Sequence, residues 1–254
     1  MLSFIGLGLY DERSITVQGK EILEDVDQAF AEWYTSRLVG TDIETLEATH
    51  DIEINVRDRA GVEQEPEPIL DAATDTHVAF LTAGDTMIST THVDLRLRAH
   101  ERGIETQIVH GTTAQTAASS LTGLQNYRFG KATTLPFEET HGGVPGSVVE
   151  TIQANQERGL HTLVYLDIDG ENERYMTGDV AAELLDGELD EQRGVVVGQA
   201  GSSDPTVRAD WLSTLAEESF GEPLHLLVLP GELHPIEEDA LSALGGMTRD
   251  AGGQ

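Results

Sequence analysis

A glycine and an aspartate, Gly84 and Asp85, directly follow an apolar stretch, residues 79–82, that has the character of a buried strand. Apolar residues then resume at helical spacing through Val93 and Ala99, which predicts a strand, a tight turn and a helix. Parallel α/β sheets bind ligands at the carboxyl ends of their strands, where Asp85 would lie. Asp85 is therefore a candidate for ligand binding, although turn chemistry alone would explain it as a helix cap.

Small polar residues also follow two other predicted strands. Gly111-Thr112-Thr113-Ala114 ends the strand expected over residues 106–110. Two neighbouring strand ends of this kind can hold one ligand between them, although each also fits an ordinary turn. Tyr34, Thr35 and Ser36 follow the strand expected over residues 29–32. Their position makes them candidates for lining the side of an acceptor substrate, with packing and turn capping as the alternative.

A glycine pair, Gly6 and Gly8, follows the first predicted strand, as the glycines of dinucleotide-binding sites do. The third glycine of that fingerprint is missing, because Asp11 occupies its place. Glu32 lies where a ribose-binding acid would be expected, which keeps a nicotinamide site open as a weak alternative. Close approach of the backbone to a ligand, or a tight turn, explains the two glycines more simply.

Several kinds of catalytic chemistry lack their residues. The chain has no cysteine, which excludes disulfides and thiol catalysis. Its nine histidines show no metal-binding spacing, so no metal site is expected. The sequence contains neither a Gly-x-Ser-x-Gly elbow nor a phosphate-binding Gly-x-x-x-x-Gly-Lys loop. Pairing two of the many carboxylates as an acid and a base would be arbitrary, so no catalytic residue is assigned.

Regular alternation of strands and helices over about the first 110 residues predicts a parallel α/β sheet. The pattern changes after residues 111–115, which suggests two domains, 1–112 and 113–254, both α/β. Strands are expected over 2–9, 29–32, 52–56, 79–82, 106–110, 133–137, 160–168, 195–198 and 224–229. Helices are expected over 16–25, 42–49, 116–124, 147–157, 179–185, 208–218 and 237–244, besides the one after Asp85.

The charge balance restricts the environment and the partners. Forty-six acidic residues against fifteen basic ones give a net charge of −31. Concentrated salt relieves such repulsion because it shortens the Debye length, to about 3 Å at 1 M. We therefore expect a cytoplasmic protein of a halophile. Nucleic acid is not an expected partner, because no basic patch is available to neutralise phosphates. The apolar start lacks a basic leader and no apolar run reaches a bilayer's thickness, so neither a signal peptide nor a membrane partner is expected.

Taken together, these residues resemble the tetrapyrrole-methylase-like, class III family of S-adenosylmethionine-dependent methyltransferases. The resemblance covers nearly the whole chain and is closest to those members that modify translation elongation factor 2. The order and spacing of the landmarks is specific, whereas each alone would be weak. They are residues 4–13 (FIGLGLYDER), 31–36 (AEWYTS), 80–85 (FLTAGD), 90–92 (TTH), 159–163 (GLHTL), 166–168 (LDI), 223–225 (PLH) and 233–234 (LH).

The resemblance implies a two-domain tetrapyrrole-methylase-like fold, with a parallel sheet in the N-terminal domain and a mixed sheet in the C-terminal one. It implies that S-adenosyl-L-methionine binds in the cleft between them and that the protein is a homodimer. The reaction implied is successive N-methylation, to the trimethylated product, of the aminocarboxypropyl-modified histidine of elongation factor 2, an intermediate step of diphthamide biosynthesis. By motif match the cofactor contacts would be Leu9, Asp85, Ile88, Thr113, Ala114, Leu166, Ala200 and His225.

The chain departs from the family's pattern at a few of these positions. Thr86 stands where the family usually has proline, and Thr113-Ala114 where it usually has Ser-Ile. Gln199 replaces a common arginine beside Ala200. Two other functions remain open at this point. One is methylation of a corrin or porphyrin ring by the same fold, and the other is a non-enzymatic acidic module that binds the translation machinery.

Overall fold

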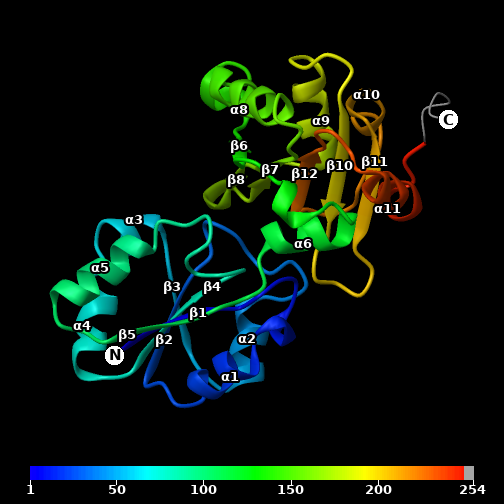
Figure 1. Ribbon diagram of the computed structural model, residues 1–254. Coiled ribbons are helices and arrows are strands. Elements are labelled where there is room, and N and C mark those ends of the chain that lie inside the picture. Colours follow the sequence, from blue (N-terminus) through cyan, green and yellow to red (C-terminus); the bar gives the residue numbers. More distant parts are fainter. Residues whose placement is uncertain (249–254) are drawn as a thin grey trace. The chain divides into compact units, whose positions relative to one another are not determined.

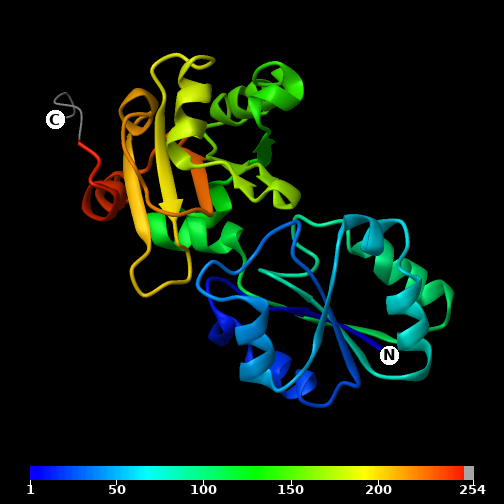
Figure 2. The ribbon, with the colours of Figure 1, turned by 180° about the vertical axis from the view of Figure 1, so that it is seen from behind.

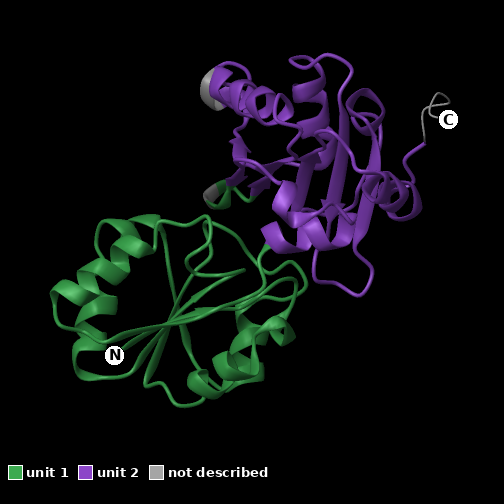
Figure 3. Cartoon of the chain, viewed as in Figure 1, with its two compact units in different colours: residues 1–113, 169–173 green, residues 114–168, 174–254 purple. Residues whose placement is uncertain are grey.

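The chain folds into two compact units, which are coloured separately in Figure 3. The computed structural model describes residues 1–248, apart from the side chains of Thr140, His141 and Glu171. The first unit comprises residues 1–113 together with 169–173, and the second comprises 114–168 and 174–248. The segment 169–173 thus groups with the first unit, although the expected boundary places it in the second domain. The division into domains 1–112 and 113–254 stays a prediction.

The first unit is built on a five-stranded, entirely parallel sheet in the order β3-β2-β4-β1-β5 (Figure 1). The order places the first strand between the two strands whose ends carry Asp85 and Gly111. The strands are β1 Leu2–Gly6, β2 Gln28–Glu32, β3 Ile54–Arg57, β4 Val78–Thr82 and β5 Thr106–Val109.

Helices cover both faces of this sheet, because alternate residues of each strand point to opposite sides. Phe4 and Phe80 pack with the helices α3, α4 and α5, whereas Ile5 and Leu81 pack with α1 and α2. Figure 1 and Figure 2 show these two helical layers from opposite directions. The helical segments are η1 Glu12–Ser14, α1 Val17–Leu23, α2 Ile43–His50, α3 Arg59–Glu63, α4 Glu67–Asp75 and α5 Val93–Glu101.

The second unit has a mixed five-stranded sheet in the order β11-β10-β12-β7-β6. The pairs β11–β10, β10–β12 and β12–β7 are antiparallel, and β7–β6 is parallel. The strands are β6 Thr133–Leu135, β7 Thr162–Leu166, β10 Arg193–Gly198, β11 Thr206–Trp211 and β12 His225–Leu229, and a separate two-stranded ribbon is formed by β8 Ile168–Asp169 and β9 Arg174–Tyr175.

This sheet also has two covered faces. Val196 and Leu227 lie in a core with α8, α9 and α10, while Val197 and Val228 lie in a core with α6 and α11. The helical segments of this unit are α6 Ala114–Thr122, η2 Asn126–Arg128, α7 Glu138–His141, α8 Gly146–Gln156, α9 Gly178–Asp186, α10 Leu212–Leu215 and α11 Pro235–Gly245. The short helix η3 Gly170–Asn172 belongs to the segment 169–173 of the first unit. The parallel sheet and the mixed sheet confirm the expected fold class.

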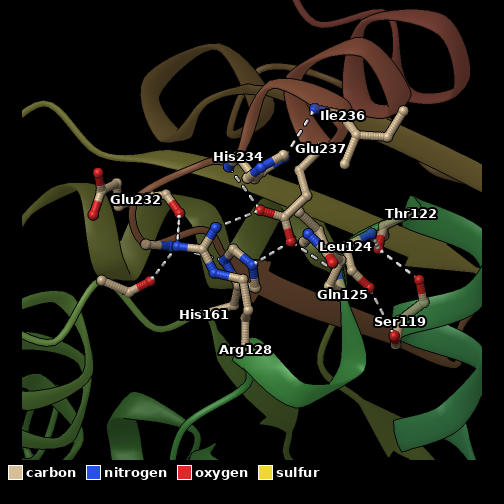
Figure 4. A network of polar contacts seen from close by, with 12 residues as sticks. Ser119, Thr122, Leu124, Gln125, Arg128, His161, Glu232, His234, Ile236 and Glu237 are labelled. Carbon is tan, nitrogen blue, oxygen red and sulfur yellow. Dashed lines mark hydrogen bonds and ion pairs between the residues drawn. The ribbon is translucent and has the colours of Figure 1, made fainter.

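A buried carboxylate ties the start of α11 to the rest of the second unit (Figure 4). Glu237 is fully buried and accepts four hydrogen bonds, which come from the backbone N–H groups of Gln125 and His234 and from the side chains of Arg128 and His161. The Nε2 atom of His161 lies 3.0 Å from Oε1 of Glu237. Burial raises the pKa of this carboxyl group, but the hydrogen bonds outweigh burial and lower it overall.

Two sequence-based expectations about elements are wrong. Residues 206–211 form the edge strand β11, and only Leu212–Leu215 are helical within the helix expected over 208–218. The alternation of Val207, Ala209 and Trp211 with polar residues fits a strand, and pairing with β10 fixes it. The other is the alternative of Asp85 as a helix cap, because the predicted helix, α5, begins at Val93 with His92 in the cap position. Within residues 1–248, no helix combines the length and apolar composition that a membrane span requires.

Candidate functional site at the ends of the strands

Four glycines lie at the carboxyl ends of β1, β4 and β5, which are in close contact. Gly8 pairs with Gly84 through reciprocal backbone hydrogen bonds of 3.1 and 2.7 Å. A Cβ atom on Gly6 would lie 2.5 Å from the carbonyl oxygen of Gly84 and 2.6 Å from the amide nitrogen of Gly111. The glycines therefore serve close packing of backbone against backbone, whereas the sequence suggested approach to a ligand or a tight turn for Gly6 and Gly8.

Asp85 and His110 meet across the end of β1. Oδ2 of Asp85 lies 2.7 Å from Nδ1 of His110 and 3.3 Å from the amide nitrogen of Gly111, whereas Oδ1 accepts the N–H of Met87 at 2.9 Å. The Asp85 side chain is 3% exposed and that of His110 is 76% exposed. Asp85 thus fastens the β4 turn to the end of β5, and three of about four acceptor positions of its carboxylate are occupied by the chain itself.

Glu32 holds the loop that follows β2. Its buried carboxylate accepts the backbone N–H groups of Tyr34 and Thr35 at 3.1 and 3.0 Å, and the hydroxyl of Thr35 donates to its other oxygen. Burial raises the pKa of Glu32, and these hydrogen bonds partly oppose that effect. Glu32 therefore orders residues 33–36, the segment that we expect on the side of the acceptor.

A buried histidine lies beside this carboxylate. The ring of His92 donates from Nδ1 to the carbonyl oxygen of Thr86 at 3.0 Å, and its Nε2 lies 3.9 Å from Oε1 of Glu32. Burial lowers the pKa of His92, which favours the neutral ring. Among the described residues, the Nε2 atom has no hydrogen-bond partner. Glu32 and His92 thus link the β2 loop to the loop that begins at Asp85.

Four of the sequence-predicted cofactor contacts belong to the first unit and follow its strand ends. Leu9 comes after β1, and its carbonyl oxygen accepts the hydroxyl of Ser14. Ile88 donates its N–H to the carbonyl oxygen of Asp85 at 3.3 Å and leaves its apolar side chain 43% exposed. Thr113 follows Gly111 at the end of β5. These three and Asp85, the fourth, therefore follow strands that end at one edge of the parallel sheet.

The other four predicted contacts belong to the second unit and also gather at one sheet edge. His225 begins β12 and is paired in register with Gly198, two residues before Ala200. Leu166 ends β7, the other neighbour of β12, and Ala114 begins α6, which packs against the same sheet. The structure thus brings Ala200, His225 and Leu166 to the ends of three adjacent strands.

His225 is the polar member of this second group. It is buried, its Nδ1 accepts the N–H of Gly178 at 3.0 Å, and its Nε2 has no hydrogen-bond partner. Burial lowers the pKa of the ring, which keeps the ring neutral with its proton on Nε2. The backbone groups of Glu222 and Phe220 lie near the ring and partly oppose this lowering of its pKa, and the Nε2 N–H stays available to an acceptor on a ligand.

A cavity of about 470 Å³ lies elsewhere in the second unit. Its lining mixes carboxylates with apolar side chains, among them Glu139, Glu183, Phe137 and Val144, with Arg174 stacked on the ring of Phe137. None of the eight predicted contacts is among its lining residues within the described part of the chain. It is therefore separate from the residues discussed above.

Sequence reasoning missed the roles of His110 and Glu32. His110 closed a predicted strand and was given no function, because the partner that orients it is 25 residues away in the chain. Glu32 was considered only as a ribose-binding acid, whereas its carboxylate is occupied by Tyr34 and Thr35. The signal available for both was position, since each lies at the carboxyl end of a parallel strand.

Known proteins match this chain over nearly its full length. The family described as tetrapyrrole (corrin/porphyrin) methylases matches residues 1–216. The diphthine synthase of Halorubrum lacusprofundi is 66% identical, with 97% of both chains covered, and that of Haloarcula marismortui is 64% identical, covering 97% of this chain and 98% of the relative. A crystal structure of diphthine synthase superimposes with a TM-score of 0.90 at 34% identity, covering 97% of this chain and 96% of the other. The chain therefore belongs to the tetrapyrrole methylases and, within them, to the diphthine synthases.

Proposed function

We propose that this protein methylates the amino nitrogen of the aminocarboxypropyl-modified histidine of translation elongation factor 2, in diphthamide biosynthesis. The observation that carries the proposal is the similarity, at 64–66% identity over nearly the full length, to relatives that are diphthine synthases. The protein is accordingly a methyltransferase. We further propose that it adds three methyl groups and acts as a homodimer in the cytoplasm.

S-adenosyl-L-methionine is the proposed methyl donor, and it supplies a methyl group already activated by a sulfonium centre. The proposed contacts are Leu9, Asp85, Ile88, Thr113, Ala114, Leu166, Ala200 and His225. Two features support the fit. The buried Nε2 of His225 makes no hydrogen bond within the described residues, so it is available as a donor to a base or ribose. A Cβ atom at Gly84 would contact nothing within 4 Å, which leaves room beside the β4 turn.

The chain's main task in this reaction is to position its reactants. Holding two reactants in line can lower a barrier by about 7–11 kcal/mol. The loop at Tyr34 and Thr35, ordered by Glu32, is the proposed acceptor side, and the turn at Asp85 is the proposed donor side. His92 lies between these two loops, because its Nδ1 donates to Thr86 on the donor side and its Nε2 lies 3.9 Å from Oε1 of Glu32 on the acceptor side.

The proposal is tested by offering two acceptors to the purified protein in molar potassium chloride. We expect radioactive methyl groups to pass from S-adenosylmethionine to the modified elongation factor and not to a corrin or porphyrin. Transfer to the tetrapyrrole alone would favour a ring methylase, the alternative that the family's description raises. Binding of the factor without methyl transfer under any condition would favour a non-enzymatic module.

A further inference from the structure

The pair formed by Asp85 and His110 has the arrangement of a base poised to take a proton. Because a carboxylate accepts hydrogen bonds but cannot donate them, the 2.7 Å contact places the ring proton of His110 on Nδ1. The other ring nitrogen, Nε2, then carries the lone pair. The same division of labour, in which a buried carboxylate fixes the tautomer and the outer nitrogen accepts the proton, operates in hydrolytic triads.

Asp85 is buried and His110 is exposed, as a fixed carboxylate and an accessible base should be. The Asp85 side chain is 3% exposed and held by Met87 and Gly111, so it cannot turn away from the ring. The side chain of His110 is 76% exposed, so its Nε2 can meet a substrate and afterwards release a proton to water. The histidines His92 and His161 are fully buried by comparison and have no such route.

The position of His110 matches the chemistry. It follows β5 directly, beside Gly111 and three residues before Thr113, at the sheet edge that holds half of the proposed cofactor contacts. An amine with a lysine-like pKa of about 10 is protonated at neutral pH and must lose a proton before it attacks. Positioned bases contribute about 10²–10⁴-fold to such steps.

We propose that His110 is the catalytic base that deprotonates the acceptor amine and that Asp85 is its positioning residue. This inference rests on the proposed function. Nε2 of His110 takes one proton from the ammonium group, whose nitrogen lone pair then forms a bond to the methyl carbon while the carbon–sulfur bond breaks with its electrons left on sulfur. His110 then passes the proton to water. Each methyl group added therefore releases one proton, and three rounds release three.

The experiment compares His110→Gln with the matched variant His100→Gln, which alters an exposed histidine on α5. We expect His110→Gln to lower kcat about 10²-fold or more and to leave S-adenosylmethionine binding by calorimetry within about threefold. His100→Gln should match the parent protein in both. Imidazole added to His110→Ala should restore part of the lost rate, because the ring is exposed.

The pH profile distinguishes a base from a structural residue. With His110 as base, kcat should depend less steeply on pH than in His110→Gln, because the ring rather than water takes the proton from the amine. Without it, kcat should rise about tenfold per pH unit toward pH 10, as the free amine fraction does. The Asp85 carboxylate lies against the His110 ring. Asp85→Asn removes this negative charge, so it should also shift the dependence of kcat on pH.

Nitrogen NMR of the histidine rings gives a readout without turnover. We expect the neutral ring of His110 to carry its proton on Nδ1 in the parent protein and to lose this preference in Asp85→Asn. A proton on Nε2 in the parent, or an unchanged kcat and pH profile in His110→Gln, would overturn the inference while methylation by the parent protein upheld the proposed function.

Discussion

The backbones of Gly6 and Gly111 lie so close that a Cβ atom on Gly6 would stand 2.6 Å from the amide nitrogen of Gly111. A Cβ atom on Gly111 would in turn collide with the carbonyl oxygen of Gly84. The ends of β1 and β5 can therefore approach each other and the turn after β4 only because Gly6 and Gly111 have no side chains. This contact allows Asp85 to reach His110 across the end of the intervening strand.

We predict that Gly111→Ala destabilises the protein by about 3 kcal/mol or more, because backbone atoms must move to admit the methyl group. The matched variant is Gly84→Ala. Its Cβ atom would contact nothing within 4 Å, and only its φ of +76° is unfavourable for alanine, so a loss of about 1–2 kcal/mol is expected. Urea unfolding in molar potassium chloride measures both. Equal losses would show that crowding at Gly111 does not matter.

The network around Glu237 predicts a large loss on truncation. Glu237→Ala would leave His161 and Arg128 without their shared carboxylate and remove two acceptors of backbone N–H groups. Breaking a buried charged pair costs about 3–5 kcal/mol. We expect a fall of that size in the free energy of unfolding measured by denaturant titration.

The neighbouring Glu238 provides the control, because it lies on the same helix and its side chain is exposed. Glu238→Ala should change the free energy of unfolding by no more than about 0.5 kcal/mol. If both variants lost the same amount, the effect would belong to helix α11 in general rather than to the buried network.

Stability should fall on acidification below about pH 6.5. Burial lowers the pKa of His92, His161 and His225 in the folded protein, so the unfolded chain binds their protons first as pH falls. Each proton taken up on unfolding costs the folded state about 1.4 kcal/mol per pH unit. The contribution of these three histidines to the free energy of unfolding is therefore fully present above pH 6.5. It is lost as the pH falls from 6.5 to the lower pKa values of the folded protein.

Two carboxyl groups modify this curve in opposite directions. Because the pKa of Glu237 is lowered in the folded protein, the free energy of unfolding falls further as the pH drops below about 4.5. Because the pKa of Glu32 is raised, the folded protein takes up this proton first, and the free energy of unfolding gains from it as the pH falls. Unfolding free energies measured from pH 8 to pH 5 at constant salt test the histidine contribution. A flat curve over that interval would contradict it.

The net charge of −31 predicts that the melting temperature rises from low to molar potassium chloride. Salt screens the repulsion between carboxylates, because the Debye length shortens from about 10 Å at 0.1 M to about 3 Å at 1 M. Scanning calorimetry across this range measures the effect. A melting temperature that stayed constant or fell would be evidence against the expectation of a halophile's protein.

Hydrophobic periodicity was enough to predict most of the fold. The parallel strands of the first unit are buried on both faces, so stretches such as 78–82 are continuously apolar and easily recognised. The edge strand β11 was missed although Arg208 and Asp210 alternate with apolar residues, and pairing with β10 decides its conformation. Local propensity is weakest at sheet edges, where contacts distant in sequence outweigh it.

The site could be predicted only in part, for a related reason. Asp85 was expected to be either a ligand contact or a helix cap, and the structure shows its bonds to Met87 and His110. Its pairing with His110 depends on β1 lying between β4 and β5, which no local pattern reveals. The contacts proposed for S-adenosylmethionine came from the family resemblance and stay predictions.

Mass spectrometry of the modified histidine of elongation factor 2 tests the central claim most directly. The factor carrying the aminocarboxypropyl group is incubated with this protein and S-adenosylmethionine in molar potassium chloride, and the peptide that contains the histidine is analysed over time. We predict successive mass increases of one methyl group each, up to three, on that side chain. An unchanged peptide, under conditions in which the protein is folded and binds S-adenosylmethionine, would contradict the account.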